Sequence, residues 1–161
     1  MFRLIDSPLG PLRLQASPRG LSRVDITAAS TPQEAVDSVE EGGIEKRSAD
    51  VLDTAQAQLT EYFAGRRRSF ELPLDPPTTT EFRAAVHAQL AEIGYGETVT
   101  YRDVAKLLGR PGATRAVGSA CGANPLLIVR PCHRVLRSDG GLGGYAGGLE
   151  AKRFLLTLEE N

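Results

Sequence analysis

The chain has 161 residues, of which 41% are hydrophobic and 24% are charged. These fractions are typical of a folded globular protein and exclude a chain that is disordered throughout. The net charge of −1 excludes a general basic field, so any binding of nucleic acid has to use a local surface. No apolar run is long enough for a signal peptide or a membrane span, and we therefore expect a cytoplasmic protein without membrane contact.

The first part of the chain has the pattern of a small sheet and one helix. Three short apolar-rich segments, at residues 2–5, 12–16 and 21–26, are separated by turns containing Pro, Gly and Ser, which predicts an antiparallel meander. Residues 31–50 are acidic and poor in large apolar side chains, which predicts a loop. From residue 51 to residue 63, apolar side chains recur at helical spacing and predict a helix.

A run of prolines divides the sequence. Pro73, Pro76 and Pro77 lack amide donors and bias the residues before them to extended geometry, so neither a helix nor a central strand can continue there. We place a domain boundary at this run, with an N-terminal α/β domain over residues 1–76 and a C-terminal domain over residues 77–161. The second domain is predicted to begin with a helix near residues 82–93, capped by one of the preceding threonines.

Two further helices are predicted around a tight turn. Thr100 can cap a helix over residues 101–108, with Asp103 as its capping-box partner. Gly109 and Pro111 end that helix, and a second one follows from about Pro111 to Gly122, so the unit has the outline of a helix-turn-helix. The second helix consists almost entirely of small residues, which allow close approach either by another helix or by an external partner. Both interpretations are open at this point.

The most specific stretch is Pro131-Cys132-His133-Arg134-Val135, which follows an apolar run at residues 126–129 and precedes a glycine-rich segment. A lone Cys in an intracellular protein is most often an inert core thiol, but a Cys beside a His can also be an activated nucleophile. We expect a strand over residues 126–129 and extended geometry at the motif. Neighbouring side chains of an extended segment point to opposite faces, so the Cys and His side chains would need a bridging water or a bend to communicate. The two cysteines fit neither a zinc spacing nor a disulfide framework, and we expect no metal and no cofactor.

The motif and its surroundings resemble the signature of the O6-alkylguanine-DNA alkyltransferases, which are self-sacrificing repair proteins. The resemblance includes Gly140–Gly148, Gly96–Tyr101, Arg115–Gly118 and Asn124–Pro125, and it spans about the C-terminal half of the chain. It implies an α+β fold, with a small antiparallel-sheet N-terminal domain of ribonuclease H-like type. The C-terminal domain would be mainly helical, with a helix-turn-helix of winged-helix type.

The resemblance also implies an activity. The protein would flip O6-alkylguanine out of duplex DNA and transfer the alkyl group irreversibly to its own cysteine, once per chain. Its partners would be double-stranded DNA, approached through the minor groove, and the flipped base. We expect a monomer, with cooperative binding along DNA as a further option.

Site residues follow from the same resemblance. Cys132 would be the nucleophile, activated through a water by His133, which Glu159 orients. Tyr101 would donate a proton to the guanine ring, and Asn124 would brace the active-site turn by hydrogen bonds.

The DNA-binding residues implied by the resemblance have two roles. Arg115 would be a finger that fills the space of the flipped base, Arg102 and Lys106 would contact phosphates, and Thr114 and Ala116 would lie against the groove. The base pocket would be formed by Tyr145 as a wall, the amide of Ala146, the carbonyl of Val135, and the neighbouring Pro131 and Gly147.

Three other functions compete with this one. A thiol hydrolase would share the reactive Cys132 but would turn over, a non-enzymatic binder of alkylated DNA would lack the cysteine, and a helix-turn-helix regulator would need no pocket. Cys121 is expected to be dispensable. Arg130, just before the motif, is expected either to tune the thiol from the same face of a strand or to be a surface residue.

Overall fold

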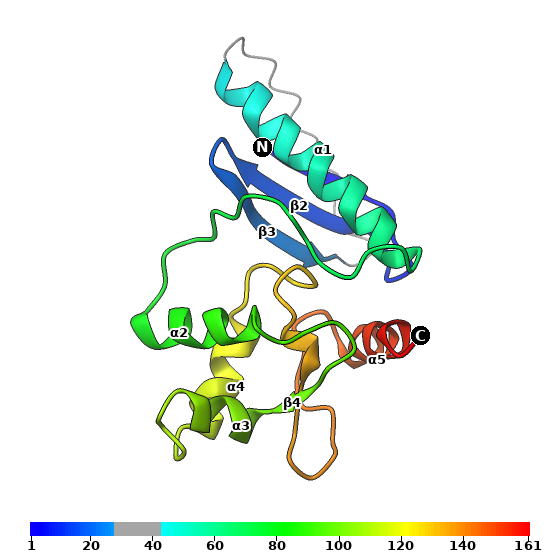
Figure 1. Ribbon diagram of the computed structural model, residues 1–161. Coiled ribbons are helices and arrows are strands. Elements are labelled where there is room, and N and C mark those ends of the chain that lie inside the picture. Colours follow the sequence, from blue (N-terminus) through cyan, green and yellow to red (C-terminus); the bar gives the residue numbers. More distant parts are fainter. Residues whose placement is uncertain (28–42) are drawn as a thin grey trace. The chain divides into compact units, whose positions relative to one another are not determined.

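The computed structural model describes residues 1–27 and 43–161, and the chain divides into two units, Met1–Pro77 and Thr78–Asn161 (Figure 1). Within the described ranges, no helix combines the length and the apolar character needed to cross a membrane.

The sheet of the first unit has three antiparallel strands, β1 (Phe2–Ile5), β2 (Leu12–Ser17) and β3 (Gly20–Ile26), in the order β1-β2-β3. Ile5 lies opposite Leu12, which in turn lies opposite Ile26, and a bulge interrupts the second pairing at Gln15 and Ala16. The side chains of β2 alternate between buried and half-buried, as expected for a sheet with one covered face. The predicted antiparallel sheet is confirmed.

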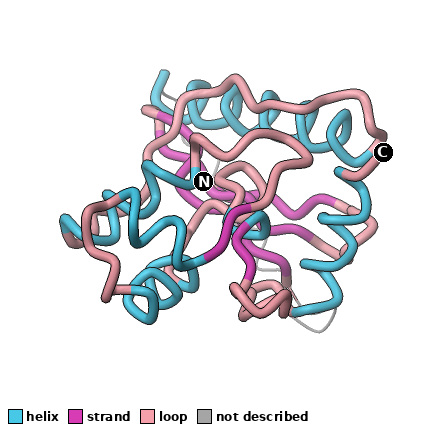
Figure 2. The backbone as a smooth tube through the Cα atoms, turned by 60° about the horizontal axis from the view of Figure 1, so that its bottom comes forward, coloured by secondary structure: helices cyan, strands magenta, loops and turns pink. Residues whose placement is uncertain are grey.

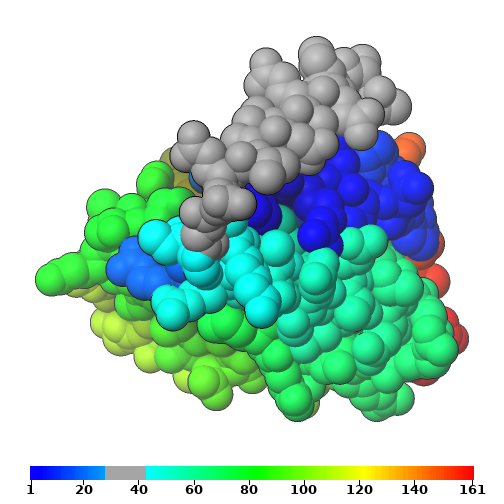
Figure 3. Space-filling model, turned by 90° about the horizontal axis from the view of Figure 1, so that it is seen from above, coloured from blue at the N-terminus to red at the C-terminus, as the bar shows by residue number. Residues whose placement is uncertain are grey.

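Helix α1 (Gly43–Phe63) covers that face and lies across the strands in Figures 1 and 2. Its buried residues include Val51, Leu52, Ala55, Leu59 and Tyr62, and they recur at helical spacing. The opposite side of α1 forms a broad outer surface, as the space-filling view in Figure 3 shows.

The prediction of a loop at residues 31–50 is wrong from residue 43 onward, where α1 has already begun. Residues 28–42 lie outside the described part of the chain. The first turns of α1 contain Glu, Lys and Arg, which form helices readily without contributing large apolar side chains, so the apolar pattern alone did not reveal them.

The segment after α1 returns along the edge of the sheet. The side-chain amide of Gln58 makes two hydrogen bonds of 2.8 Å with the backbone of Glu71. The Leu21 amide then donates to the Pro73 carbonyl at 2.9 Å, beside the turn between β2 and β3. A Cβ at Gly20 would lie 2.6 Å from that carbonyl oxygen, so the first position of β3 requires glycine.

The second unit contains short elements joined by tight turns. They are α2 (Glu81–Leu90), β4 (Val99–Thr100), α3 (Tyr101–Leu107), α4 (Thr114–Gly122), the 3-10 turn η1 (Cys132–Arg134), β5 (Val135–Leu136) and α5 (Leu149–Glu159). Strands β4 and β5 pair in parallel, and α3 and α4 form the expected helix-turn-helix. The capping box of α3 is confirmed, because the Thr100 side chain and the Asp103 amide are 3.0 Å apart and the reciprocal bond is also 3.0 Å.

Two predicted elements of this unit are wrong. Helix α4 begins at Thr114 instead of near Pro111, and residues 127–129 form a turn after the single bridge residue Leu126 instead of a strand. The Arg130 amide donates to the Leu126 carbonyl at 2.9 Å, and Ile128 has a φ of 73°. Because this conformation is strained for a β-branched residue, surrounding contacts must hold it.

Candidate active site

Asn124 holds the turns that lead to the motif. Its side-chain nitrogen donates to the Arg130 carbonyl at 2.9 Å, and its side-chain oxygen accepts from the Leu126 amide at 3.1 Å. Both bonds close the loop around Ile128, which is fully buried. Asn124 therefore supplies the contacts that stabilise the strained segment.

Cys132 begins η1, so the extended geometry expected for Cys132 and His133 is wrong. Pro131 precedes the turn, and the Arg134 amide donates back to its carbonyl at 3.1 Å. Burial raises the pKa of the Cys132 thiol, while a hydrogen bond from Asn124 and the charges of Lys152 and Arg130 act in the opposite direction. Arg130 thus favours the thiolate by its charge, although the strand register proposed for it does not exist.

A buried carboxylate orients the neighbouring base. Glu159 is 5% exposed, and its Oε2 accepts from Nε2 of His133 at 2.7 Å. Arg134 donates to the same carboxylate from Nε at 2.7 Å and from Nη2 at 3.1 Å. A carboxylate paired with arginine only accepts hydrogen bonds, so the proton of neutral His133 must sit on Nε2. Nδ1 is then left as the proton acceptor.

His133 is ready to act as a base because it is neutral. Its side chain is fully buried, and burial lowers its pKa in spite of the hydrogen bond and charge of Glu159. The folded protein therefore presents an uncharged imidazole with one open nitrogen at neutral pH.

Lys152 is the main functional residue that the sequence did not reveal. It is fully buried in the first half of α5, and its ammonium donates to the Val135 carbonyl at 2.7 Å, to the Leu142 carbonyl, and to the Gly144 carbonyl at 3.3 Å. The Tyr101 hydroxyl lies 3.4 Å from the same ammonium. One cation therefore fixes β5, the glycine-rich loop and the entrance of α3.

A signal for Lys152 exists in the sequence. It lies three residues before Leu155 and seven before Glu159, both of which are buried, so it is a charged residue on the apolar face of an amphipathic helix. A buried lysine needs hydrogen-bond acceptors, and here loop carbonyls supply them.

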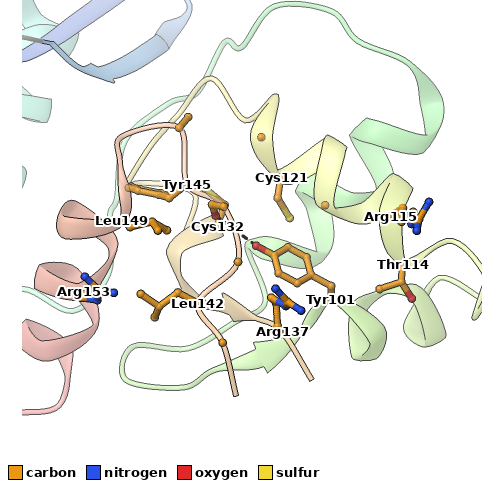
Figure 4. Close-up of a pocket in the computed structure, with 16 residues that line it drawn as sticks. Tyr101, Thr114, Arg115, Cys121, Cys132, Arg137, Leu142, Tyr145, Leu149 and Arg153 are labelled. Atoms are coloured by element: carbon orange, nitrogen blue, oxygen red, sulfur yellow. Dashed lines mark hydrogen bonds between the residues drawn. The ribbon is translucent and has the colours of Figure 1, made fainter. Parts of the chain in front are cut away.

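Cys132 opens into a cavity of about 800 Å³, within the range of small-molecule sites. In Figure 4, Arg115 and Thr114 lie on one side of it and Leu149 and Arg153 on the other, with Tyr101 and Cys132 between them. Among the described residues that line the cavity, three are arginines and none is acidic. The lining residues are Tyr101, Thr114, Arg115, Gly118, Cys121, Gly122, Cys132, Arg137, Gly141, Leu142, Gly143, Gly144, Tyr145, Ala146, Leu149 and Arg153.

Tyr101 and the glycine-rich loop meet at close range. The Tyr101 hydroxyl donates to the Gly144 carbonyl at 3.4 Å, and a Cβ at Gly143 would lie 2.6 Å from the hydroxyl oxygen. Gly143 also has a φ of 71°, so both its backbone and its neighbour require glycine. Burial, with the nearby thiols, raises the pKa of Tyr101 to about 12, which keeps its proton available for donation.

The predicted site residues fall into two groups. Cys132, Tyr101, Tyr145, Ala146, Arg115 and Thr114 line the cavity, as does Cys121, whose pKa burial raises to about 12. Pro131, Val135 and Gly147 do not line it, and the Val135 carbonyl already accepts a bond from Lys152. Ala116, Arg102 and Lys106 are exposed on α4 and α3. Across the described ranges, no three His, Cys, Asp or Glu side chains converge as metal ligands do.

The two glycines of α4 are not explained by packing within the described structure. A Cβ added at Gly118 or Gly122 would meet nothing within 4 Å among the described residues. The inward side of α4 is instead held by Val117 and Ala120, and the Ala120 carbonyl is 2.8 Å from Nε2 of the buried His87 on α2. The interpretation as a close helix crossing therefore fails at these two glycines.

Comparison with known proteins gives matches over both units. Residues 81–161 match the 6-O-methylguanine DNA methyltransferase, DNA binding domain, and residues 1–76 match its ribonuclease-like domain. The methylated-DNA–protein-cysteine methyltransferase of Methanosarcina barkeri is 43% identical over 160 residues, which cover 99% of this chain and 97% of the relative.

Solved structures agree with this relationship. The Mycobacterium tuberculosis O6-methylguanine methyltransferase is 38% identical with a TM-score of 0.80, covering 99% of this chain and 92% of that one. A crystal structure of Mycobacterium tuberculosis OGT in complex with DNA is 39% identical with a TM-score of 0.82 and the same coverage. The chain therefore belongs to the 6-O-methylguanine DNA methyltransferase family, and the resemblance and the α+β fold class derived from the sequence are confirmed.

Lys152→Met is predicted to slow alkylation of Cys132 by the free base O6-benzylguanine by about tenfold or more, because one carbonyl of β5, two carbonyls of the glycine-rich loop and the Tyr101 hydroxyl lose their common donor. The rate is measured by quenching the reaction at successive times and weighing the intact protein by mass spectrometry. Arg83→Met, which removes an exposed cation on α2, is the matched control and should react like the unmodified protein. A wild-type rate in folded Lys152→Met would show that the loop is held by other contacts.

Proposed function

We propose that this chain repairs alkylated DNA by transferring the alkyl group of O6-alkylguanine to Sγ of Cys132. Membership in the family supports DNA repair by alkyl transfer to a cysteine. The observation that supports Cys132 as that cysteine is its position in the cavity wall, one residue before a neutral histidine whose open nitrogen is set by Glu159. Cys121 also lines the cavity, but Gly122 follows it in the chain, so it has no adjacent histidine.

The transfer is a displacement at a saturated carbon. The Cys132 proton moves to His133, the thiolate forms a bond from Sγ to the alkyl carbon, and the bond from that carbon to the guanine oxygen breaks with its electrons remaining on the base. Tyr101 can donate a proton to the electron-rich ring, and its raised pKa keeps that proton in place until it is needed. The thioether product has no good leaving group, so the chain reacts once.

Base recognition would use backbone groups of the cavity. The amide of Ala146 can donate to the guanine oxygen, and the Tyr145 ring can form a wall of the pocket. The Val135 carbonyl could bind the exocyclic amine only with its second lone pair, since Lys152 occupies the first. Pro131 and Gly147 would act by shaping the adjacent backbone.

DNA would approach through its minor groove along α4. Open space around Gly118 and Gly122, and the exposed Ala116 beside them, supports an external partner that needs a shallow surface. Arg102 and Lys106 are exposed one helical turn apart on α3, where they can bind phosphates. Arg115, at the cavity and on α4, is suited to fill the stack after the base has been flipped.

The two proposed domains are residues 1–76 and residues 77–161, and DNA binding and alkyl transfer belong to the second. We propose a monomer, because a single copy contains every group that the reaction uses. A cytoplasmic location fits a protein whose substrate is DNA.

A mass measurement tests the function. The protein is mixed with a duplex that contains O6-methylguanine, in excess, and is then weighed intact and after digestion. We expect one methyl group per chain, on the peptide with Cys132, and none in Cys132→Ser. Continued turnover would favour the thiol hydrolase, and tight binding without transfer would favour a lesion-binding protein.

Arg115→Ala is predicted to slow repair of duplex DNA by about tenfold or more while leaving the reaction with free O6-benzylguanine near its normal rate. Flipping costs a few kcal/mol in a duplex, and a free base requires none. Both rates are measured by intact mass, with Arg83→Ala as the control for loss of an exposed positive charge. An equal loss on both substrates would assign Arg115 to the pocket instead of the DNA.

A further inference from the structure

Two buried polar atoms of the second unit have no hydrogen-bond partner among the described residues, namely Nδ1 of His133 and the hydroxyl oxygen of Tyr145. A buried polar group left without a partner costs about 1–3 kcal/mol. Most such atoms in native proteins are bonded to protein groups or to ordered water. Each of these two atoms therefore needs a ligand.

Both atoms belong to the surroundings of the same thiol. His133 follows Cys132 in η1, and Tyr145 lines the cavity beside Cys132 in Figure 4. The Tyr145 ring contributes to the cavity wall, whereas its hydroxyl oxygen is shut off from solvent. Burial raises the pKa of this phenol, and the charges of Cys132 and Glu159 raise it further. The hydroxyl therefore lies within electrostatic range of both groups and keeps its proton.

We propose that the Tyr145 hydroxyl is a third ligand of the water that the family resemblance implies between Sγ of Cys132 and Nδ1 of His133. A buried water typically makes about three hydrogen bonds to protein groups, and these three atoms supply that number. The inference rests on the proposed function, because it assigns Tyr145 to the activation of the same thiol. Tyr145 is a positioning residue here, since it acts on the thiol only through the water.

The proton movement balances through this water. In the resting state the water accepts hydrogen bonds from the Cys132 thiol and the Tyr145 hydroxyl, and it donates one to Nδ1 of His133. The thiol proton passes to the water while a water proton passes to Nδ1, which leaves a thiolate, an imidazolium and an intact water. The water then accepts from Nδ1–H and from Tyr145 and donates to the thiolate. Tyr145 donates in both states, so it holds the water oxygen fixed throughout.

Tyr145→Phe tests this assignment because it removes the hydroxyl and retains the ring that forms the wall. The probe is iodoacetamide, which needs neither DNA nor an alkylated base, applied from pH 6 to pH 10. A Cys121→Ala background leaves Cys132 as the single thiol in the chain. Tyr95→Phe is the matched control, since its hydroxyl lies 3.4 Å from the Leu158 carbonyl on α5 and is not part of the proposed water site.

We expect Tyr145→Phe to raise the apparent thiol pKa by about one unit and to slow the reaction at neutral pH about tenfold. The rate with free O6-benzylguanine should fall in parallel. An unchanged pH profile with iodoacetamide would overturn the proposal. If the reaction with O6-benzylguanine were nevertheless slower, the Tyr145 hydroxyl would be assigned to substrate binding. Failure of the proposed function would give a different pair of results. The pH profile with iodoacetamide would change as expected, but the unsubstituted chain would accept no methyl group from duplex DNA.

A crystal structure of the unsubstituted protein gives a second test that does not depend on the folding of a variant. We expect an ordered water within hydrogen-bond distance of Nδ1 of His133, the Tyr145 hydroxyl and Sγ of Cys132. Clear density without such a water, or a direct bond between Tyr145 and His133, would overturn the proposal.

Discussion

The buried carboxylate of Glu159 is the interaction on which the rest of the second unit depends. It accepts from Nε2 of His133 and from two nitrogens of Arg134, and the Gly96 amide lies 3.3 Å from its Oε1. Arg134 also donates to the Ile93 carbonyl at 2.6 Å. One side chain near the end of α5 therefore joins the motif to the segment before β4. The same bonds decide which nitrogen of His133 is free to accept a proton.

Lys152, near the start of α5, holds the carbonyl groups on the other side of the site. Its ammonium is enclosed by carbonyls from β5 and the glycine-rich loop, and its charge lowers the pKa of both buried thiols against the effect of burial. Helix α5 thus supplies a carboxylate that orients His133, the proposed base, and a cation that holds the cavity loop. Removing the charge of Glu159 leaves the buried Arg134 without its partner, which is far more costly than losing an exposed ion pair. Removing the charge of Lys152 leaves backbone carbonyls without their donor.

Local signals in the sequence predicted much of the fold and failed where side chains act across turns. The capping box at Thr100 and the three strands depend on neighbouring residues and were correctly predicted. Residues 126–129 are apolar like a strand, but bonds from Asn124 fold them into turns, and spacing alone does not reveal those bonds. The relation of Cys132 to His133 was misjudged for the same reason. Lys152 lies on the apolar face of α5, which was a signal, but its acceptors are backbone carbonyls and cannot be recognised from side-chain identities.

The central claim is that one carboxylate both holds the motif and orients the catalytic base. It is tested most directly by the rate at which folded Glu159→Gln reacts with free O6-benzylguanine. Glu150→Gln, an exposed change in the first turn of α5, is the control, and circular dichroism verifies that each variant is folded. The account predicts a loss of about a hundredfold or more, as expected when a positioned general base is disabled. A wild-type rate in folded Glu159→Gln would contradict it.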